Sequence, residues 1–447
     1  MSELTNIFGD IANAIRSKNG ESNNYLPSEM SNAILDIPTG GGGDEYKNLC
    51  CDILAGTASN IVLNGVTDIA NFKFMEDGMS THNLVSINFP DVINTGYRSF
   101  ENCRNLKDVY LPNANSLGNR SFYNCQNITN FYAPNVKFIN DSCFDNAGKY
   151  EAMYNNTTWN AYFPEVENIR MSAFYNSGIG EVYLNNLSGS NIAGYAFAFC
   201  NHLETVYAPE LTSLTQGYMF QYCTRLNNLY MPKLQQVGQY CFQGCTNLID
   251  ADFNNVTDIG RSFEGSGLVN AIFPNLVNIS GGDAFYLCNN LTNVYMPNLV
   301  WMNYAYTFEM CPNLIDVTFE NLYRLGNYTF TKCYNLTNAT FYNLGQTNGT
   351  AFNGCNNLLK VDIYTPVMLN NEVFNKCDNF NTLILRGNTL STIWANTFNN
   401  CPFNNGEANL YVPNDLIASY EAAPNWSTIL AYPNVNILPI EGSPYDI

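Results

Sequence analysis

Cysteine has the most obvious chemical potential in this chain, because it recurs at a fixed distance after a phenylalanine. It follows by three residues at Cys103, Cys125, Cys200, Cys223, Cys245, Cys288, Cys311, Cys333, Cys355, Cys377 and Cys401. A zinc or redox site would need paired ligands with histidine partners, and the chain has only 2 histidines. The total of 15 cysteines is odd, which argues against a complete disulfide framework. The spacing therefore predicts a column of reduced, buried thiols, with no metal and no cofactor.

Asp250 and Asp252 are the acidic pair with the best spacing for hydrolysis, since residues two apart on a strand share a face. Their Cβ atoms would lie ~7 Å apart, within the range used by carboxylate pairs that cleave glycosides. Among 38 acidic residues such pairs also arise by chance, and the sequence carries no phosphate-binding loop or nucleophile elbow. We therefore expect that the protein is not an enzyme, and a glycan depolymerase stays as a minor alternative.

The charge balance excludes several classes of partner. With 38 acidic and 19 basic residues the formal net charge is −19, so nothing favours binding of nucleic acid. The first residues lack a basic segment followed by an apolar core, and no stretch of 18 apolar residues occurs. We expect a chain that is made in a cytoplasm and does not insert into a membrane.

Phenylalanine sets the repeat that must position these residues. It recurs mostly every 21 to 24 residues, at positions 100, 122, 144, 174, 197, 220, 242, 263, 285, 308, 330, 352, 374 and 398. Such a period indicates a solenoid. In each unit a short alternating strand precedes a frequent proline, as in Val109-Tyr110-Leu111-Pro112. The predicted fold is mainly β, a leucine-rich-repeat-like parallel β-solenoid of about sixteen ~22-residue coils. We expect its strand cores near residues 61, 87, 109, 131, 161, 182, 206, 229, 251, 271, 294, 317, 339, 361, 383 and 410.

Tyrosine is the most frequent residue at the outward strand position. The predicted ligand-binding residues are Tyr110, Tyr132, Tyr183, Tyr207, Tyr230 and Tyr295, with Tyr162 and Tyr411 in the same row. Rigid aromatic side chains flanked by amides and carboxylates suit sugar rings or a polar protein epitope. Tyrosines on neighbouring strands can instead stack on one another as a stabilising ladder that needs no ligand. The sequence favours neither interpretation.

Surface excursions are expected at residues 148–156 and 72–84.

The two ends differ from the repeat. Residues 1–39 predict a helical hairpin, an attachment segment whose apolar stripe includes Ile7, Phe8, Ile11, Ile15, Met30 and Ile34. Residues 40–43 are a glycine linker, residues 44–413 the solenoid and residues 414–447 a C-terminal cap. We expect Asn414 to cap a helix there, followed by Trp426 over the last coil.

The phrase Ala-Phe-x-x-Cys-x-Asn-Leu, as at residues 196–203 and 351–358, resembles the BspA-type leucine-rich repeat family over residues 50–413. Residues 11–20, 26–30 and 33–34 are similar to short N-terminal segments of bacteriophage tail and other virion proteins. The ending at residues 412–427 also resembles such phage-borne repeat proteins.

These resemblances imply a bacteriophage structural protein, such as a tail-fibre, baseplate or head-decoration adhesin. Its N-terminal segment would bind other virion proteins, and its solenoid would bind a bacterial surface glycan or protein. Its location would then be the virion, and homo-oligomers through the hairpin stay an open question. The alternative is a bacterial surface or interaction leucine-rich repeat protein without a virion role.

Overall fold

The computed structural model describes residues 60–69, 74 and 84–446. The predicted helical hairpin, the glycine linker and the excursion at residues 72–84, apart from Phe74, lie outside this part of the chain. The chain divides into two compact units, residues 1–185 (unit 1) and 186–447 (unit 2), which we describe one at a time.

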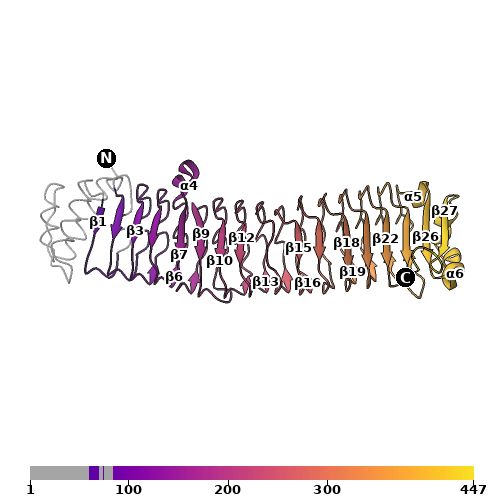
Figure 1. Cartoon of the computed structure of the whole chain (residues 1–447), viewed down its shortest axis with the longest axis horizontal. Helices are drawn as coiled ribbons and strands as arrows, with labels where there is room; N and C mark the ends of the chain where they lie inside the picture. Colours follow the sequence, from indigo (N-terminus) through magenta and orange to yellow (C-terminus); the bar gives the residue numbers. More distant parts are fainter. Residues whose placement is uncertain (1–59, 70–73, 75–83, 447) are drawn as a thin grey trace, which may run out of the picture. The chain divides into compact units, whose positions relative to one another are not determined.

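Unit 1 repeats one short parallel strand per turn, because each turn carries the same alternation of outward and inward residues. The first set of strands is β1 (Asn60–Val62), β2 (Ser86–Asn88), β3 (Asp108–Tyr110) and β5 (Asn130–Tyr132), then the pair β7 (Trp159–Tyr162) and β9 (Ile179–Tyr183). The second set is β4 (Ser116–Leu117), β6 (Phe138–Ile139) and β8 (Asn168–Ile169). The helix α4 (Lys149–Asn155) forms the predicted excursion and stands out from the coils (Figure 1).

Unit 2 continues the same pattern of parallel pairs. Its first set comprises β10 (Thr205–Tyr207), β12 (Asn228–Tyr230), β15 (Asn270–Ile272), β17 (Asn293–Tyr295), β18 (Asp316–Phe319), β20 (Asn338–Phe341), β22 (Lys360–Ile363), β24 (Thr382–Leu385), β26 (Ala408–Val412) and β27 (Val435–Pro439). The second set comprises β11 (Ser213–Leu214), β13 (Gln236–Val237), β14 (Asp258–Ile259), β16 (Asn278–Ile279), β19 (Arg324–Leu325), β21 (Gln346–Thr347), β23 (Met368–Leu369) and β25 (Thr392–Ile393).

The fold is thus a mainly β parallel solenoid of about 15 turns. The predicted strand at residue 251 is wrong, because residues 250–253 form no strand and the ladder of unit 2 is interrupted there. The turn keeps its place through its inward side chains, since Phe253 and Phe263 remain buried and contact each other.

Stacked phenylalanines fill the interior of both units. Phe100 stacks on Phe74 and Phe122 with ring centroids 5.0 and 5.1 Å apart. In unit 2 the ring of Phe330 lies 5.5 Å from that of Phe308 and 5.3 Å from that of Phe352. Each turn adds one ring to a continuous apolar column, so the burial that drives folding is shared between neighbouring turns.

Cysteine forms a second column beside the rings. The Sγ of Cys311 donates a hydrogen bond to the carbonyl oxygen of Phe285, in the turn before it, over 3.1 Å. Cys125, Cys223, Cys245, Cys288, Cys333, Cys355 and Cys377 repeat this bond at 2.9 to 3.1 Å. Each described cysteine is buried and forms no disulfide. The prediction of buried, unbridged thiols is confirmed for the described cysteines. The thiol is a second donor to a carbonyl oxygen that in most turns already accepts a main-chain N–H, as Phe285 accepts one from Cys288.

About one residue in six is asparagine, and the structure explains much of this excess. After several strands an asparagine donates its Nδ2 to a carbonyl oxygen of the preceding turn, as Asn298 does to Pro274 over 2.8 Å. Asn135, Asn255 and Asn321 bond in the same way to Pro112, Pro232 and Pro297. A side-chain amide supplies the donor that the solenoid's bends need where the main chain has no partner strand.

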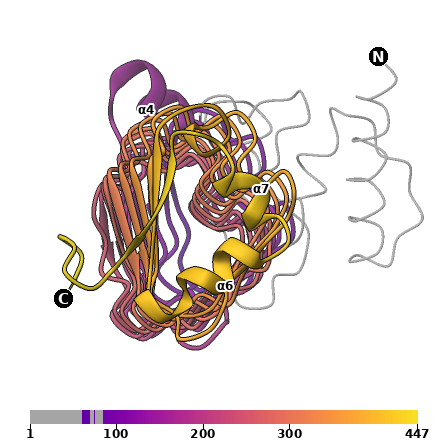
Figure 2. The ribbon, with the colours of Figure 1, turned by 90° about the vertical axis from the view of Figure 1, so that its right-hand side faces the viewer.

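The C-terminal cap combines helices with a strand. It contains the 3-10 helix η2 (Asn414–Leu416), α6 (Ile417–Ala422), α7 (Trp426–Leu430) and the strand β27, and the short helix α5 (Pro402–Asn405) precedes it. Trp426 is buried, packs on Phe398 and donates its Nε1 to the carbonyl oxygen of Ser391 over 2.8 Å. Figure 2 shows α6 and α7 over the end of the coil. The predicted capping role of the Asn414 side chain is wrong, because the N-cap residues of η2 and α6 are Pro413 and Leu416 and neither helix has a side-chain cap bond. The main-chain N–H of Asn414 donates to Glu441 Oε2.

Candidate binding surfaces

The first candidate surface is the outer sheet face of unit 1. Tyr110 and Tyr132 are register partners whose rings stack at 5.1 Å and 8°. With Tyr162 they are 44 to 57% exposed. Tyr183, the register partner of Tyr162, is half-buried, and its hydroxyl donates to Glu181 Oε2 over 3.2 Å. Tyr110 and Tyr132 therefore form a stacked pair, whereas the rings of Tyr162 and Tyr183 lie 6.4 Å apart at 59° and are tilted.

The helix α4 adds a second aromatic cluster to unit 1. Tyr150, Met153 and Tyr154 are 47 to 68% exposed, and the two tyrosine rings lie 4.7 Å apart. Buried Glu151 joins the helix to a neighbouring turn, because its Oε1 lies 3.3 Å from Lys107 Nζ. Its Oε2 accepts a hydrogen bond from Asn155 at the end of the helix. These contacts lower the pKa of Glu151, the Asn155 bond most. A fixed helix with exposed tyrosine and methionine is typical of a protein-binding surface.

Unit 2 carries a shorter row of tyrosines. Tyr207 and Tyr230 stack at 4.9 Å and 5°, and Tyr295 pairs in register with Ile272. Between them lies the interruption at residues 250–253, where Asp250 and Asp252 are exposed. Asp252 Oδ1 accepts a hydrogen bond from the main-chain N–H of Asn254. Two exposed carboxylates outside a cleft lack the buried general acid that glycoside hydrolysis needs.

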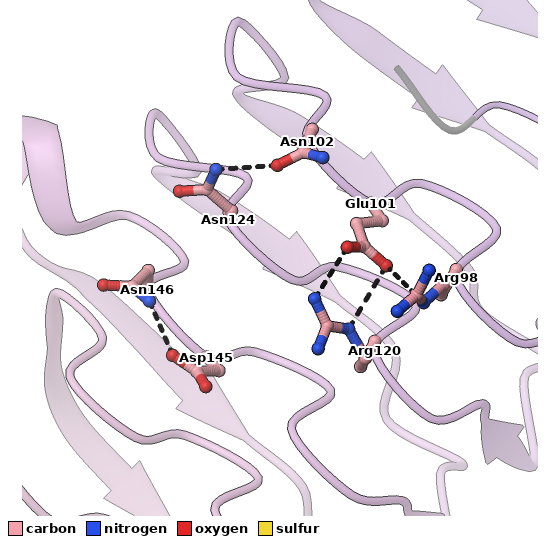
Figure 3. Close-up of polar contacts among 7 residues, drawn as sticks. All are labelled: Arg98, Glu101, Asn102, Arg120, Asn124, Asp145 and Asn146. Carbon is pink, nitrogen blue, oxygen red and sulfur yellow. Dashed lines mark hydrogen bonds and ion pairs between the residues drawn. The ribbon is translucent and has the colours of Figure 1, made fainter. Parts of the chain in front are cut away.

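A charged cluster in unit 1 is fully paired (Figure 3). Buried Glu101 accepts bonds from Arg120 over 2.7 and 3.2 Å and lies 3.0 Å from Arg98 Nε. The guanidinium of Arg120 also lies over the ring of Tyr123, at 3.8 Å. Glu101 is therefore committed to joining two turns, which is a structural role.

Asp145, on the turn after Arg120, is the carboxylate of this region that titrates near neutrality. Burial raises its pKa to about 7, although the charges of Arg120 and Lys149 oppose the shift. Its Oδ1 accepts a hydrogen bond from Asn146 over 2.6 Å (Figure 3). No pattern in the sequence identified Asp145, because its burial depends on how neighbouring turns stack.

The asparagines beside this cluster form an amide ladder that the sequence analysis missed. Asn124 donates to Asn102 Oδ1 and Asn176 donates to Asn146 Oδ1, each over 2.7 Å. All four have positive φ, between 55° and 64°. Asparagine tolerates this left-handed conformation better than most residues, which explains its place two residues after the phenylalanine.

One shallow depression of about 310 Å³ lies on the second set of strands in unit 2. Its lining is largely polar and includes Gln216, Tyr218, Gln239, Asp258 and Ser280. Its lining includes no histidine, and Ser280 Oγ donates a hydrogen bond to Asp258 Oδ2 over 3.2 Å. The depression therefore offers hydrogen-bond donors and acceptors to a ligand.

The thiols of the cysteine column are unreactive for a physical reason. Within the column, burial raises the pKa of Cys333 to about 12 and that of Cys288 to about 11. It also raises the pKa of Cys143 and Cys241, which lie outside the column, to about 12. A thiol held protonated is neither a nucleophile nor a metal ligand. Within residues 60–69, 74 and 84–446, no cluster of three or more histidine, cysteine or acidic residues could hold a metal ion. No helix of that part is long and apolar enough to cross a membrane.

The predicted attachment residues, Ile7, Phe8, Ile11, Ile15, Met30 and Ile34, lie outside the described residues. The predicted ligand-binding tyrosines are brought together only within short groups, Tyr110 with Tyr132 and Tyr207 with Tyr230. Tyr295 stands in a separate two-stranded sheet. Whether any of these tyrosines binds a ligand stays a prediction.

Known proteins share this architecture. The family model for the BspA type leucine rich repeat region matches residues 57–163, 167–293, 260–377 and 302–414. A leucine-rich repeat protein from Bacteroides ovatus is similar in fold, with a TM-score of 0.62 at 20% identity, over 85% of this chain and 94% of that one. One from Eubacterium ventriosum has a TM-score of 0.38 at 15% identity, over 77% and 90% of the two chains. No curated protein sequence matches. The chain belongs to the BspA-type leucine-rich repeat family.

Proposed function

We propose that this chain is a bacterial leucine-rich repeat interaction protein without catalytic activity, which recognises a protein partner at a cell surface. The outer sheet face of unit 1, formed by Tyr110, Tyr132 and Tyr162, and the helix α4 together form the recognition surface. The observation that carries this proposal is the exposure of these three tyrosines and of Tyr150, Met153 and Tyr154, all in one unit. Tyrosine and methionine are enriched at interfaces because they offer large contact areas with an adaptable or polar edge.

The stacking of the tyrosines favours a protein over a glycan. A sugar ring binds an aromatic residue by lying flat on the face of the ring. At 5.1 Å and 8°, Tyr110 and Tyr132 cover one face of each other. Their edges and hydroxyl groups stay free, and these are the parts that contact a protein epitope.

The charge of the chain bears on the kind of partner. A net charge of −19 repels strongly acidic surfaces and accelerates association with basic ones. In unit 1 the polar residues around the tyrosines include Asp108, Asn130 and Glu181. We therefore expect a partner whose contact surface supplies hydrogen-bond donors or positive charge.

The proposal can be tested with fluorescently labelled full-length chain and a panel of bacterial cells. We expect cell binding that falls at least tenfold in the triple variant Tyr110→Ser, Tyr132→Ser, Tyr162→Ser. Treating the cells with protease should abolish binding. Binding that survives protease but not glycosidase treatment would establish a glycan ligand instead.

A matched variant controls for surface changes in general. Tyr222, Tyr304 and Tyr334 are 40 to 50% exposed and belong to unit 2, whereas the proposed surface belongs to unit 1. Their simultaneous replacement by serine should leave cell binding unchanged. Equal loss in the two triple variants would refute the assignment of the surface to unit 1.

Attachment to a virion is a finer proposal that depends on residues 1–39 alone. The similarity of residues 11–34 to virion segments supports it, with the apolar stripe of Ile7, Phe8, Ile11, Ile15, Met30 and Ile34 as the contact. Residues 1–43 would then be necessary for the chain to copurify with phage particles. Copurification of a chain lacking them would refute attachment through this segment. Failure of the unaltered chain to copurify would remove the virion role and leave the cell-surface interaction protein.

A further inference from the structure

The outer sheet face changes character near the end of unit 2. Asp362, Ile384 and Tyr411 are register partners at the outward position of β22, β24 and β26. Asp362 is 6% exposed, Ile384 is fully buried and Tyr411 is half-buried. On β18 and β20 the same position holds Thr318, which is exposed, and Thr340, which is half-buried. Something therefore covers the outer face of these three strands.

The covering element is the segment Gly442–Asp446, which follows β27. Figure 2 shows the chain leaving the cap and ending outside the sheet. The ring of Tyr445 lies edge to face on Tyr411, with centroids 4.9 Å apart at 75°. The Nζ of Lys360 lies 5.8 Å from the centroid of the Tyr445 ring, within reach of a cation–π contact. The Tyr445 side chain thus lies among groups of β22 and β26, above buried Ile384.

The main chain of the segment is recognised as well. The carbonyl oxygen of Tyr445 accepts a hydrogen bond from Arg386 Nη1 over 2.8 Å. Arg386 is held beneath it by Asp362, which accepts bonds from Nε and Nη2 over 2.8 and 3.0 Å. Both side chains are about one-tenth exposed, and the guanidinium also lies over the ring of Tyr364. The donor is therefore fixed by the sheet itself, independently of the segment.

The segment is built to come away from this face. Its hinge, Gly442, has a φ of 78°, and nothing lies within 4 Å of the position a Cβ would take. Its local bonds are internal: Gly442 N–H donates to Asp446 Oδ2, and the N–H groups of Tyr445 and Asp446 donate to Ser443. Release would leave the segment's own turn intact, since the contacts broken are those of the Tyr445 ring and carbonyl.

We propose that the outer face of β22, β24 and β26 is a binding site for a peptide that presents an aromatic side chain from a turn, and that Gly442–Asp446 occupies it as a replaceable internal ligand. The aromatic ring enters between Lys360 and Tyr411, and its main-chain carbonyl binds Arg386. A sugar fits this site poorly, because it offers no aromatic face to Lys360. This site is in unit 2 and stands independently of the surface proposed in unit 1.

Mass action sets the size of the expected effect. A short tether presents its ligand at an effective concentration of about 1 mM. For a peptide with a dissociation constant of about 100 μM, the internal segment would weaken binding of an added peptide about tenfold. Removing the internal ligand should therefore strengthen binding of the same peptide in solution by about that factor.

The test uses the full-length chain and a fluorescent peptide with the sequence of residues 440–447, followed by fluorescence anisotropy. We expect Tyr445→Ala to bind the peptide about tenfold more tightly than the unaltered chain. Adding Lys360→Ala and Tyr411→Ser to Tyr445→Ala should abolish binding. The peptide with alanine in place of its tyrosine should not bind, and Tyr432→Ser, an exposed tyrosine of the cap, should behave as the unaltered chain.

Two results would overturn the proposal. If neither Tyr445→Ala nor a chain lacking residues 442–447 bound the peptide, the segment would be only a part of the cap. If the unaltered chain and Tyr445→Ala bound it equally, the segment would not occupy the binding site. Circular dichroism of each variant shows whether the solenoid remains folded, and the deletion variant provides a second way to free the site.

Discussion

Replacing Phe330 with alanine should loosen unit 2 locally, because each phenylalanine ring is shared between neighbouring turns. Phe330 is fully buried, and its ring stacks on Phe308 at 5.5 Å and on Phe352 at 5.3 Å. Burying such a side chain removes about 200 Å² from water, which contributes about 5 kcal/mol at 25 cal/mol/Å². Alanine retains part of this, and the cavity left between two rings adds to the loss, so we expect about 3–5 kcal/mol.

Hydrogen–deuterium exchange measures this effect residue by residue. In a solenoid each turn contacts only its neighbours, so the loss should be confined to amides between about residues 308 and 355. A loss of about 3–5 kcal/mol corresponds to amide exchange that is roughly 10² to 5 × 10³ times faster there. Phe330→Leu, which fills most of the space, should cost about 1–1.5 kcal/mol, and Tyr334→Ala, at an exposed position of the same turn, should change little.

The reasoning would be refuted by either of two exchange patterns. Unchanged protection at residues 308–355 in Phe330→Ala would mean that the ring column does not hold neighbouring turns together. Equally faster exchange in both units would mean that the stack does not behave as a series of nearest-neighbour interfaces.

Three further predictions follow from single contacts. The cysteines of the column should resist iodoacetamide at pH 8 in the native state and react only after unfolding, because burial raises their pKa values. Peptide mass spectrometry measures the alkylation. Alkylation of Cys288 in the native protein would contradict its burial. Asp145 has a pKa of about 7 when folded against about 3.8 when unfolded, so its contribution to stability is lost as the pH rises from about 4 to about 7. Asp145→Asn should remove that decline in melting temperature, and an unchanged pH profile would assign the decline to other groups. Asn298→Ala should lower the free energy of unfolding by about 0.5–1 kcal/mol, because Pro274 loses its donor; chemical denaturation measures this, and no loss would make the asparagine ladder energetically neutral.

The repeat could be predicted from the sequence because each turn has the same residue types at the same spacing. The phenylalanine column, the thiols three residues later and the outward tyrosines depend on neighbours at a constant spacing. Fifteen of the sixteen expected strand cores, all but residue 251, lie in strands. Near residue 251 the interior side chain Phe253 is buried as the repeat predicts, but residues 250–253 form no strand. The apolar spacing alone therefore did not predict main-chain hydrogen bonding there.

Features that join distant parts of the chain were missed. The pattern places Ile384 and Asp362 outward, yet both are buried, because Gly442–Asp446 folds back on them from beyond the repeat. The strand β27 and the division of the cap into α6 and α7 also fall outside the period. No spacing rule encodes a segment that returns to a surface it does not continue.

The tyrosine row shows how far the sequence could define the binding site. Spacing places Tyr110, Tyr132 and Tyr162 on one face, and the structure leaves them exposed. Stacking decides which parts of the rings remain accessible, and this depends on side-chain geometry. The contribution of α4 could not be read from the period, because the helix occupies an insertion whose conformation depends on Glu151 and on the glycine at position 148. A Cβ at that glycine would collide with the Trp159 ring.

The most direct test of the recognition surface is hydroxyl-radical footprinting of the full-length chain, alone and bound to cells that lose their binding of the chain after protease treatment. Our account predicts that Tyr110, Tyr132 and Met153 are protected from oxidation when bound. Met171, which is similarly exposed in the same unit but follows the second set of strands, should be oxidised equally in both states. Protection of Met171 without protection of Tyr110 and Tyr132 would place the contact elsewhere and contradict the account.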